Sequence, residues 1–163
     1  MTPQIRLPLF VLGVSCVLFA CVGSGEPPST NTAAPAIDPC ALVTTAEASQ
    51  ALGVTVGPPE RPTEANHPPR MVTCRYTGPR GQGLAVMSVL VQMSDTADQA
   101  RRGFQSAKDQ FPGITVVSGL GDDAFAMANQ LNVLQGTVYL NITGDFDVTV
   151  AKTLAQTALT RLR

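Results

Sequence analysis

Apolar residues in the second half of this chain recur with the periods of helices and strands. Small and aromatic residues follow one another at steps of three and four: Ala97, Ala100, Phe104, Ala107 and Phe111. This spacing places them on one face of a helix over residues 97–111, which Pro112-Gly113 ends. Apolar residues at four-residue steps predict a final helix over residues 148–162, with Asp147 as its N-cap.

Alternation of apolar and polar residues predicts a set of strands before and between these helices. They cover residues 71–77, 84–93, 114–117, 124–127, 131–134 and 137–143. The last two flank Gln135-Gly136 and form the clearest hairpin pattern in the chain. Residues 84–93 are almost all apolar, which predicts a central strand that is covered on both faces.

One more helix is expected near the start of the folded part, over residues 45–52. Thr44 and Glu47 have the spacing of a capping box, and Gly53 is placed to end the helix in a left-handed conformation. The order α-ββ-α-βββ-α then predicts a single α+β domain, in which about three helices pack on one face of a mostly antiparallel sheet.

Residues 1–20 have the pattern of an export signal. Arg6 is the only charge before the apolar stretch 7–20, which is shorter than the roughly 20 residues of a membrane span. Leu18-Phe19-Ala20-Cys21 closes this stretch in the manner of a bacterial lipoprotein processing site. Cys21 is therefore the predicted lipidation residue. An ordinary cleaved signal peptide and an uncleaved anchor are the alternatives.

Residues 21–37 begin with this cysteine and are rich in Gly, Ser, Thr, Ala and Pro, so we expect a flexible tether in front of a domain at 38–163. The formal net charge of −1 argues against a nucleic-acid partner, which needs a concentrated basic patch. We expect acyl chains to hold the domain on the extracytoplasmic side of the cell membrane or the outer membrane.

Two cysteines remain for the domain, because Cys16 lies in the signal and Cys21 is assigned to the lipid. Cys40 and Cys74 are expected to form a disulfide in an oxidising compartment, and two reduced, buried cysteines are the alternative. No metal site or cofactor is expected, since His67 is the only histidine and the cysteines lack a ligand spacing.

Candidate chemistry elsewhere in the chain is sparse. Asp122 and Asp123 follow the turn Gly119-Leu120-Gly121 and are candidates for weak ligand or cation binding, although solvated turn aspartates are the simpler interpretation. The turn has the spacing of a dinucleotide-binding loop, but the two carboxylates would repel a pyrophosphate. Four arginines form either an anion-binding patch or scattered surface charge: Arg61, Arg70, Arg75 and Arg80.

Three patches together resemble a family of uncharacterised lipoproteins common in actinobacteria, the domain of unknown function 3558 family. They are residues 38–44 running on to 51–53, Cys74-Arg75-Tyr76, and residues 119–125. The resemblance covers roughly residues 38–163 and implies a secreted, lipid-anchored domain with a Cys40–Cys74 bridge. It implies no known activity and no catalytic residues.

The sequence has no G-x-S-x-G nucleophile motif and no phosphate-binding loop that the surrounding pattern supports. We therefore expect a non-enzymatic domain that binds an envelope protein, a cell-wall component or a small apolar ligand. An envelope hydrolase with Asp122 or Asp123 as its base, and an accessory subunit of a membrane enzyme, are the alternatives.

Overall fold

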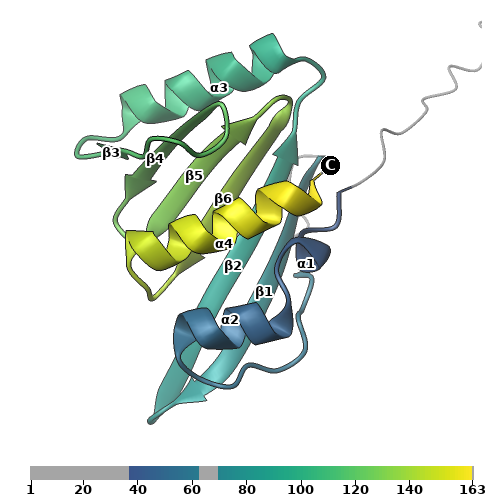
Figure 1. Ribbon diagram of the computed structural model, residues 1–163, viewed down its shortest axis with the longest axis vertical. Helices are drawn as coiled ribbons and strands as arrows, with labels where there is room; N and C mark the ends of the chain where they lie inside the picture. The colour runs from purple at the N-terminus through teal and green to yellow at the C-terminus, as the bar shows by residue number, and fades with distance from the viewer. Residues whose placement is uncertain (1–36, 63–69, 163) are drawn as a thin grey trace, which may run out of the picture. The chain divides into compact units, whose positions relative to one another are not determined.

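The computed structural model describes residues 37–62 and 70–162. The predicted signal at 1–20, the predicted lipidation residue Cys21, all of the tether except Ile37, and His67 lie outside the described residues. The described chain forms one six-stranded antiparallel sheet with helices on both faces, which confirms the predicted α+β domain (Figure 1). No helix in the described ranges is long and apolar enough to cross a membrane.

Every predicted element is present, and a one-turn helix at the start is an addition. All four strand ranges expected after the long middle helix form strands, one more than the order α-ββ-α-βββ-α counts. The helices are α1 (Pro39–Leu42), α2 (Thr45–Leu52), α3 (Ala97–Gln110) and α4 (Val148–Arg161). The strands are β1 (Met71–Arg80), β2 (Gly83–Met93), β3 (Thr115–Val116), β4 (Asp123–Met127), β5 (Gln130–Gln135) and β6 (Val138–Gly144). Helix α1 is a single turn, too short to produce a periodic pattern that the sequence would reveal.

Local sequence signals explain where the helices begin and end. The Thr44 hydroxyl accepts a hydrogen bond from the Glu47 amide, and the Glu47 carboxylate accepts one from the Thr44 amide, so the predicted capping box is present. Gly53 follows α2 in the left-handed conformation, with φ of 66°. The Asp147 carboxylate accepts from the amides of Thr149 and Val150 and begins α4 as predicted.

The strand order is β1-β2-β6-β5-β4-β3, and every neighbouring pair is antiparallel. The chain first forms the hairpin β1–β2, crosses to the far edge of the sheet through α3, and returns as the meander β3 to β6. Strand β6 then pairs with β2 from Met87↔Gly144 to Met93↔Val138. This pairing joins the hairpin and the meander into a single sheet.

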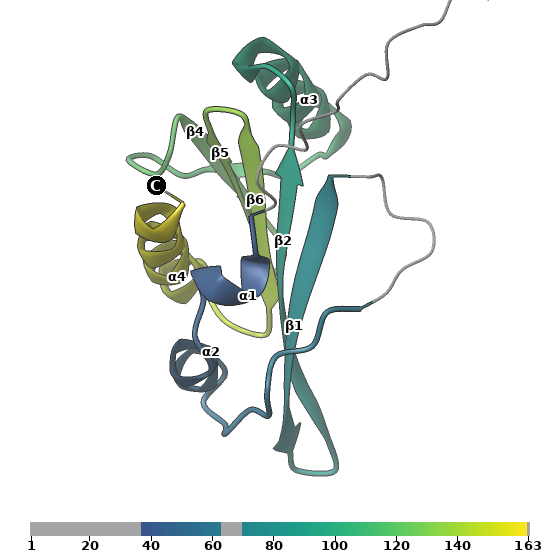
Figure 2. The same ribbon diagram turned by 90° about the vertical axis from the view of Figure 1, so that its right-hand side faces the viewer.

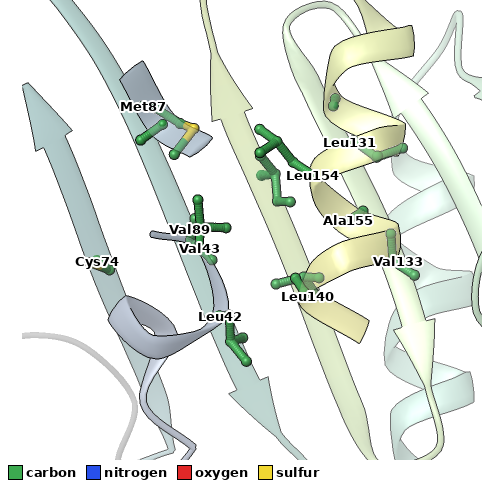
Figure 3. Close-up of a cluster of buried hydrophobic side chains, with 14 of the residues drawn as sticks. Leu42, Val43, Cys74, Met87, Val89, Leu131, Val133, Leu140, Leu154 and Ala155 are labelled. Atoms are coloured by element: carbon green, nitrogen blue, oxygen red, sulfur yellow. The ribbon is translucent and has the colours of Figure 1, made fainter. Parts of the chain in front are cut away.

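One face of the sheet, which we call the inner face, carries the main hydrophobic core. Helices α1, α2 and α4 lie on this side (Figure 2). Leu154 and Ala155 of α4 pack over the meander, and Leu42 of α1 packs over the hairpin (Figure 3). The strands contribute buried residues at every second position: Cys74, Tyr76, Met87, Val89, Val91, Leu131, Val133, Leu140 and Ile142.

Helix α3 lies on the opposite, outer face of the sheet, which differs from the expectation that the helices share one face (Figure 2). Its buried residues Ala100 and Phe104 contact Phe125 and Leu134, which point outward from β4 and β5. Side chains alternate between the two faces of a strand, so these large apolar residues need a cover of their own. The pattern of α3 predicts a helix but carries no information about which face it covers.

Strand β2 is covered on one face only, so the expectation of cover on both faces is wrong. Val89 and Val91 are fully buried on the inner face, whereas Leu84 is 71% and Val86 39% exposed on the outer face. Helix α3 covers only the end of the outer face near β5 and β6, and the apolar outer positions of β2 extend beyond it. A run of apolar residues alone therefore does not establish two-sided burial.

Covalent and polar contacts hold the start of the domain against the sheet. Cys40 of α1 and Cys74 of β1 form a disulfide, with Cα atoms 5.2 Å apart. The buried Tyr76 hydroxyl, two residues further along β1, donates a hydrogen bond to the Val43 carbonyl. Burial raises the pKa of Tyr76 to about 12, so this hydroxyl remains a donor at neutral pH.

An ion pair joins the two ends of the domain. Arg161, in the last turn of α4, donates to both oxygens of Glu47 at 2.7 Å and to the Leu42 carbonyl at 2.7 Å. The guanidinium and the capping-box bonds from Thr44 lower the pKa of Glu47 from 4.5 to about 2. This lowered pKa means that the folded state favours the ionised carboxylate.

Removal of the disulfide should destabilise the domain strongly. The two cysteines are 34 residues apart in sequence, and a closed loop of this length is worth about 3–4 kcal/mol of unfolding free energy. We expect a Cys40→Ala/Cys74→Ala variant to lose this amount in urea denaturation, and dithiothreitol to shift the wild type but not the variant. An unchanged midpoint in the variant would contradict this role.

Substitution of Glu47 by Gln should make the stability of the domain less dependent on pH. The folded-state pKa is about 2 and the ordinary value is 4.5, so the stabilisation is complete above pH 4.5 and disappears as the pH falls towards 2. Because the pair is about one-third exposed, we expect Glu47→Gln to cost about 1–2 kcal/mol at pH 7.

The difference between wild type and Glu47→Gln should then vanish between pH 4.5 and pH 2, as followed by thermal unfolding at each pH. Glu60→Gln is the matched control, because Glu60 is exposed and lies away from α4. If the difference in stability between the two proteins stayed constant across this pH range, ionisation of Glu47 would not contribute to the stability of the fold.

Candidate functional site

The predicted ligand turn at Asp122 and Asp123 is a structural corner of the sheet. Gly119 and Gly121 have φ values of 72° and 60°, which confirms the glycine turn. The Asp122 carboxylate accepts a hydrogen bond from the Gly136 amide at 2.6 Å, and Asp123 pairs with Lys108 of α3 at 2.9 Å. Each carboxylate thus has its own protein partner, and the two are not arranged as a shared site.

The four arginines that the sequence offered as an anion-binding patch also contact other residues of the domain. Three of the four arginines form separate ion pairs with aspartates, namely Arg61–Asp38, Arg70–Asp95 and Arg80–Asp145. Arg75 exchanges two backbone hydrogen bonds with Glu60 at the edge of β1. The guanidinium groups of Arg61, Arg70 and Arg80 thus lie in ion pairs with three different aspartates. Within the described residues, no group of three or more His, Cys, Asp or Glu side chains could hold a metal ion.

A groove of about 430 Å³ lies between α3 and the outer face of the sheet, and we call it the α3 groove. One wall is formed by small residues at helical spacing on α3, namely Ala100, Gly103 and Ala107. Met71 of β1 and Leu90 of β2 form the apolar surface opposite. A volume of this size lies within the range of about 300–1,000 Å³ that small-molecule sites occupy.

The floor of the α3 groove includes Gln130, Tyr139 and Asn141, which belong to a network of amide and hydroxyl side chains on β5 and β6. Asn132 pairs across the strands with Asn141 and is only 2% exposed. Its Oδ1 accepts hydrogen bonds from the Tyr139 hydroxyl at 2.6 Å and from Asn141 Nδ2 at 2.7 Å. Thr143 donates to Asn141 Oδ1 at 2.8 Å. Since buried polar groups are costly without partners, this network fixes the side chains of the floor.

Aromatic contacts hold α3 above this floor. The ring of Phe104 lies 5.1 Å from that of Phe125 and 5.9 Å from that of Tyr139, both in edge-to-face geometry. Burial raises the pKa of the Tyr139 hydroxyl, which therefore remains protonated and donates to Asn132 at neutral pH. The ring of Tyr139 thus packs against α3, while its hydroxyl is part of the polar floor.

Several polar groups in the groove retain hydrogen-bonding capacity for a ligand. The side chain of Gln92 lines the groove, and it forms no hydrogen bond with another described residue. Gln130 accepts from Asn141 through Oε1 at 3.4 Å, which leaves its NH₂ group as a donor. Among the described lining residues there is no charged side chain. The groove is therefore suited to an uncharged ligand with apolar and polar parts.

A second hollow of about 430 Å³ lies between α2 and α4, with Glu47, Thr153 and Thr157 in its lining. Glu47, the one charged side chain among its described lining residues, is already paired with Arg161. The described residues around this hollow form no buried polar network such as the one beneath α3. The α3 groove is therefore the better candidate site.

Sequence reasoning did not identify the residues of the α3 groove. Asn132 and Asn141 each interrupt an apolar run, between Leu131 and Val133 and between Leu140 and Ile142. An amide at such a position in a predicted strand is a usable signal, because it faces the side opposite its apolar neighbours. The partners of the two amides depend on strand register, which the pattern does not provide.

Comparison with known proteins adds no functional assignment. The chain matches no protein-family model, no curated protein sequence and no solved structure. The resemblance to the domain of unknown function 3558 family therefore stays a prediction. The function has to be argued from the geometry of the α3 groove and the chemistry of the cysteines.

Proposed function

We propose that this chain is a lipid-anchored envelope protein whose domain binds an uncharged ligand in the α3 groove without catalysing a reaction. The groove itself carries the binding part of this proposal, because it combines a ligand-sized volume with a polar floor and hydrogen-bonding groups left for a partner. The anchoring part rests on Cys21 and the apolar segment in front of it.

The Cys40–Cys74 disulfide supports placement outside the cytosol. Disulfides form and persist in oxidising compartments and are rare where thiols are kept reduced. This agrees with an export signal at residues 1–20 and with acylation of Cys21, which would hold the domain at the membrane through its tether. Tethering raises the effective concentration of the binding site at the envelope, so that a weak ligand is captured more efficiently.

The chemistry of the groove supports binding more than catalysis. Its titratable lining residue is Tyr139, and the raised pKa of that hydroxyl makes it a poor general base at neutral pH. Asp122 and Asp123, the bases of the alternative hydrolase hypothesis, bond to Gly136 and Lys108 at the turn. In the part of the chain that the structure describes, no specific contact favours the hydrolase or the accessory-subunit alternative over a binding domain.

Cys21→Ser should abolish lipidation and release the protein from membranes. The serine hydroxyl cannot form the thioether through which the lipid is attached. We expect metabolic labelling with a palmitate analogue to mark the wild type and the control Cys16→Ser, but not Cys21→Ser. Label retained on Cys21→Ser, or its loss in Cys16→Ser, would disprove the assignment of the anchor.

Gly103→Leu should block the groove while leaving the fold intact. A Cβ at Gly103 would meet no atom within 4 Å, and Leu in a helix is more favourable than Gly by roughly 0.5–1 kcal/mol. The neutral apolar dye N-phenyl-1-naphthylamine should gain fluorescence with the wild type and with Gln105→Leu, an exposed control on α3. We expect at least a fivefold weaker response from Gly103→Leu. Equal responses from the two variants would argue against ligand binding in the groove.

A further inference from the structure

The dimensions of the α3 groove define the size of ligand that fits it. Its small-residue wall runs from Ala100 to Ala107 along α3, which corresponds to about 10 Å at a rise of about 1.5 Å per residue. The floor spans β2, β6 and β5, and two strand spacings also amount to about 10 Å. About three residues of an extended chain have this length, at roughly 3.3 Å per residue.

None of the described lining residues is charged, and this favours a ligand without a net charge. A charged group that enters the groove would lose water without gaining a counter-ion, which is far more costly than the burial of a neutral amide. Lys108 of α3 is already paired with Asp123 and lies beside the ring of Phe104. Arg70, next to the lining residue Met71, is paired with Asp95. The groove therefore discriminates against carboxylates, phosphates and ammonium groups.

The polar groups of the groove decide the functional group of the ligand. The Gln92 amide offers donors and an acceptor, and the NH₂ of Gln130 offers a donor, on two strands that flank β6. A purely aliphatic ligand would cover these groups without replacing the hydrogen bonds that they make to water, which disfavours its binding. A sugar would place many hydroxyls against Met71, Leu90 and the small residues of α3, where they would lack partners.

A peptide group satisfies both requirements, because it is uncharged and carries one donor and one acceptor. A segment of three residues fits a groove of about 430 Å³ only if its side chains are small, and these would lie against Ala100, Gly103 and Ala107. Building on the proposed binding function, we propose that the α3 groove takes an uncharged, extended peptide segment of about three residues with small side chains, hydrogen-bonded to Gln92 and Gln130.

Titration calorimetry with the full-length chain in detergent tests this proposal with three probes: acetyl-Ala-Ala-Ala-N-methylamide, N-acetylglucosamine and dodecanol. The blocked peptide should bind more tightly than either other probe. Trialanine with free termini should bind at least tenfold more weakly than the blocked peptide, because its terminal charges would lack counter-ions in the groove.

Two variants locate the binding. Gln92→Leu should weaken the blocked peptide about tenfold, the effect of one lost hydrogen bond of about 1.4 kcal/mol. Gln135→Leu, at the exposed end of β5 and outside the α3 groove, should bind as the wild type does. Gly103→Leu should abolish binding, and it serves as a second variant if Gln92→Leu does not fold.

The possible outcomes separate the peptide inference from the proposed function. If N-acetylglucosamine or dodecanol binds more tightly than the peptide and Gly103→Leu abolishes that binding, the groove is a ligand site but the peptide inference is wrong. If no probe binds and Gly103→Leu leaves the dye response unchanged, both are wrong. Equal peptide affinity in wild type and Gln92→Leu also overturns the inference.

Discussion

The pairing of β2 with β6 is the interaction on which the rest of this structure depends. It joins two parts of the chain that are distant in sequence, the hairpin β1–β2 and the meander β3 to β6. Its register keeps Val89 and Val91 on the same face as Leu140 and Ile142, so that one core forms. A shift by one residue would turn the apolar side chains of one half towards solvent.

The same pairing assembles the candidate site on the other face. Gln92 of the hairpin lies opposite Tyr139 of the meander, and Leu90 lies opposite Asn141. Helix α3 connects the two halves and packs its Phe104 over this junction, which turns an open sheet face into a groove. The α3 groove therefore draws its lining from both the hairpin and the meander as well as from α3, and its geometry depends on the same register as the core.

The disulfide and the long-range polar contacts that hold the domain together lie away from this groove. The disulfide, the hydrogen bond of Tyr76 and the contacts of Arg161 act on α1, on Val43 and on the first turn of α2, on the inner side of the sheet. They hold the chain termini of the domain together and leave the outer face available to a ligand. Such a division between a rigid scaffold and an open face would suit the binding function that we propose.

The sequence by itself determined the local features: the capping box at Thr44, the glycine turn before Asp122, the strands, and the class of the fold. These depend on interactions between residues near one another in the chain. Only the tertiary structure decided that α3 covers the outer face, that β2 is fully buried on one side only, and that Gln92, Gln130 and Asn141 share a site. Those outcomes depend on strand order and register, which bring together residues whose local patterns carry no information about one another.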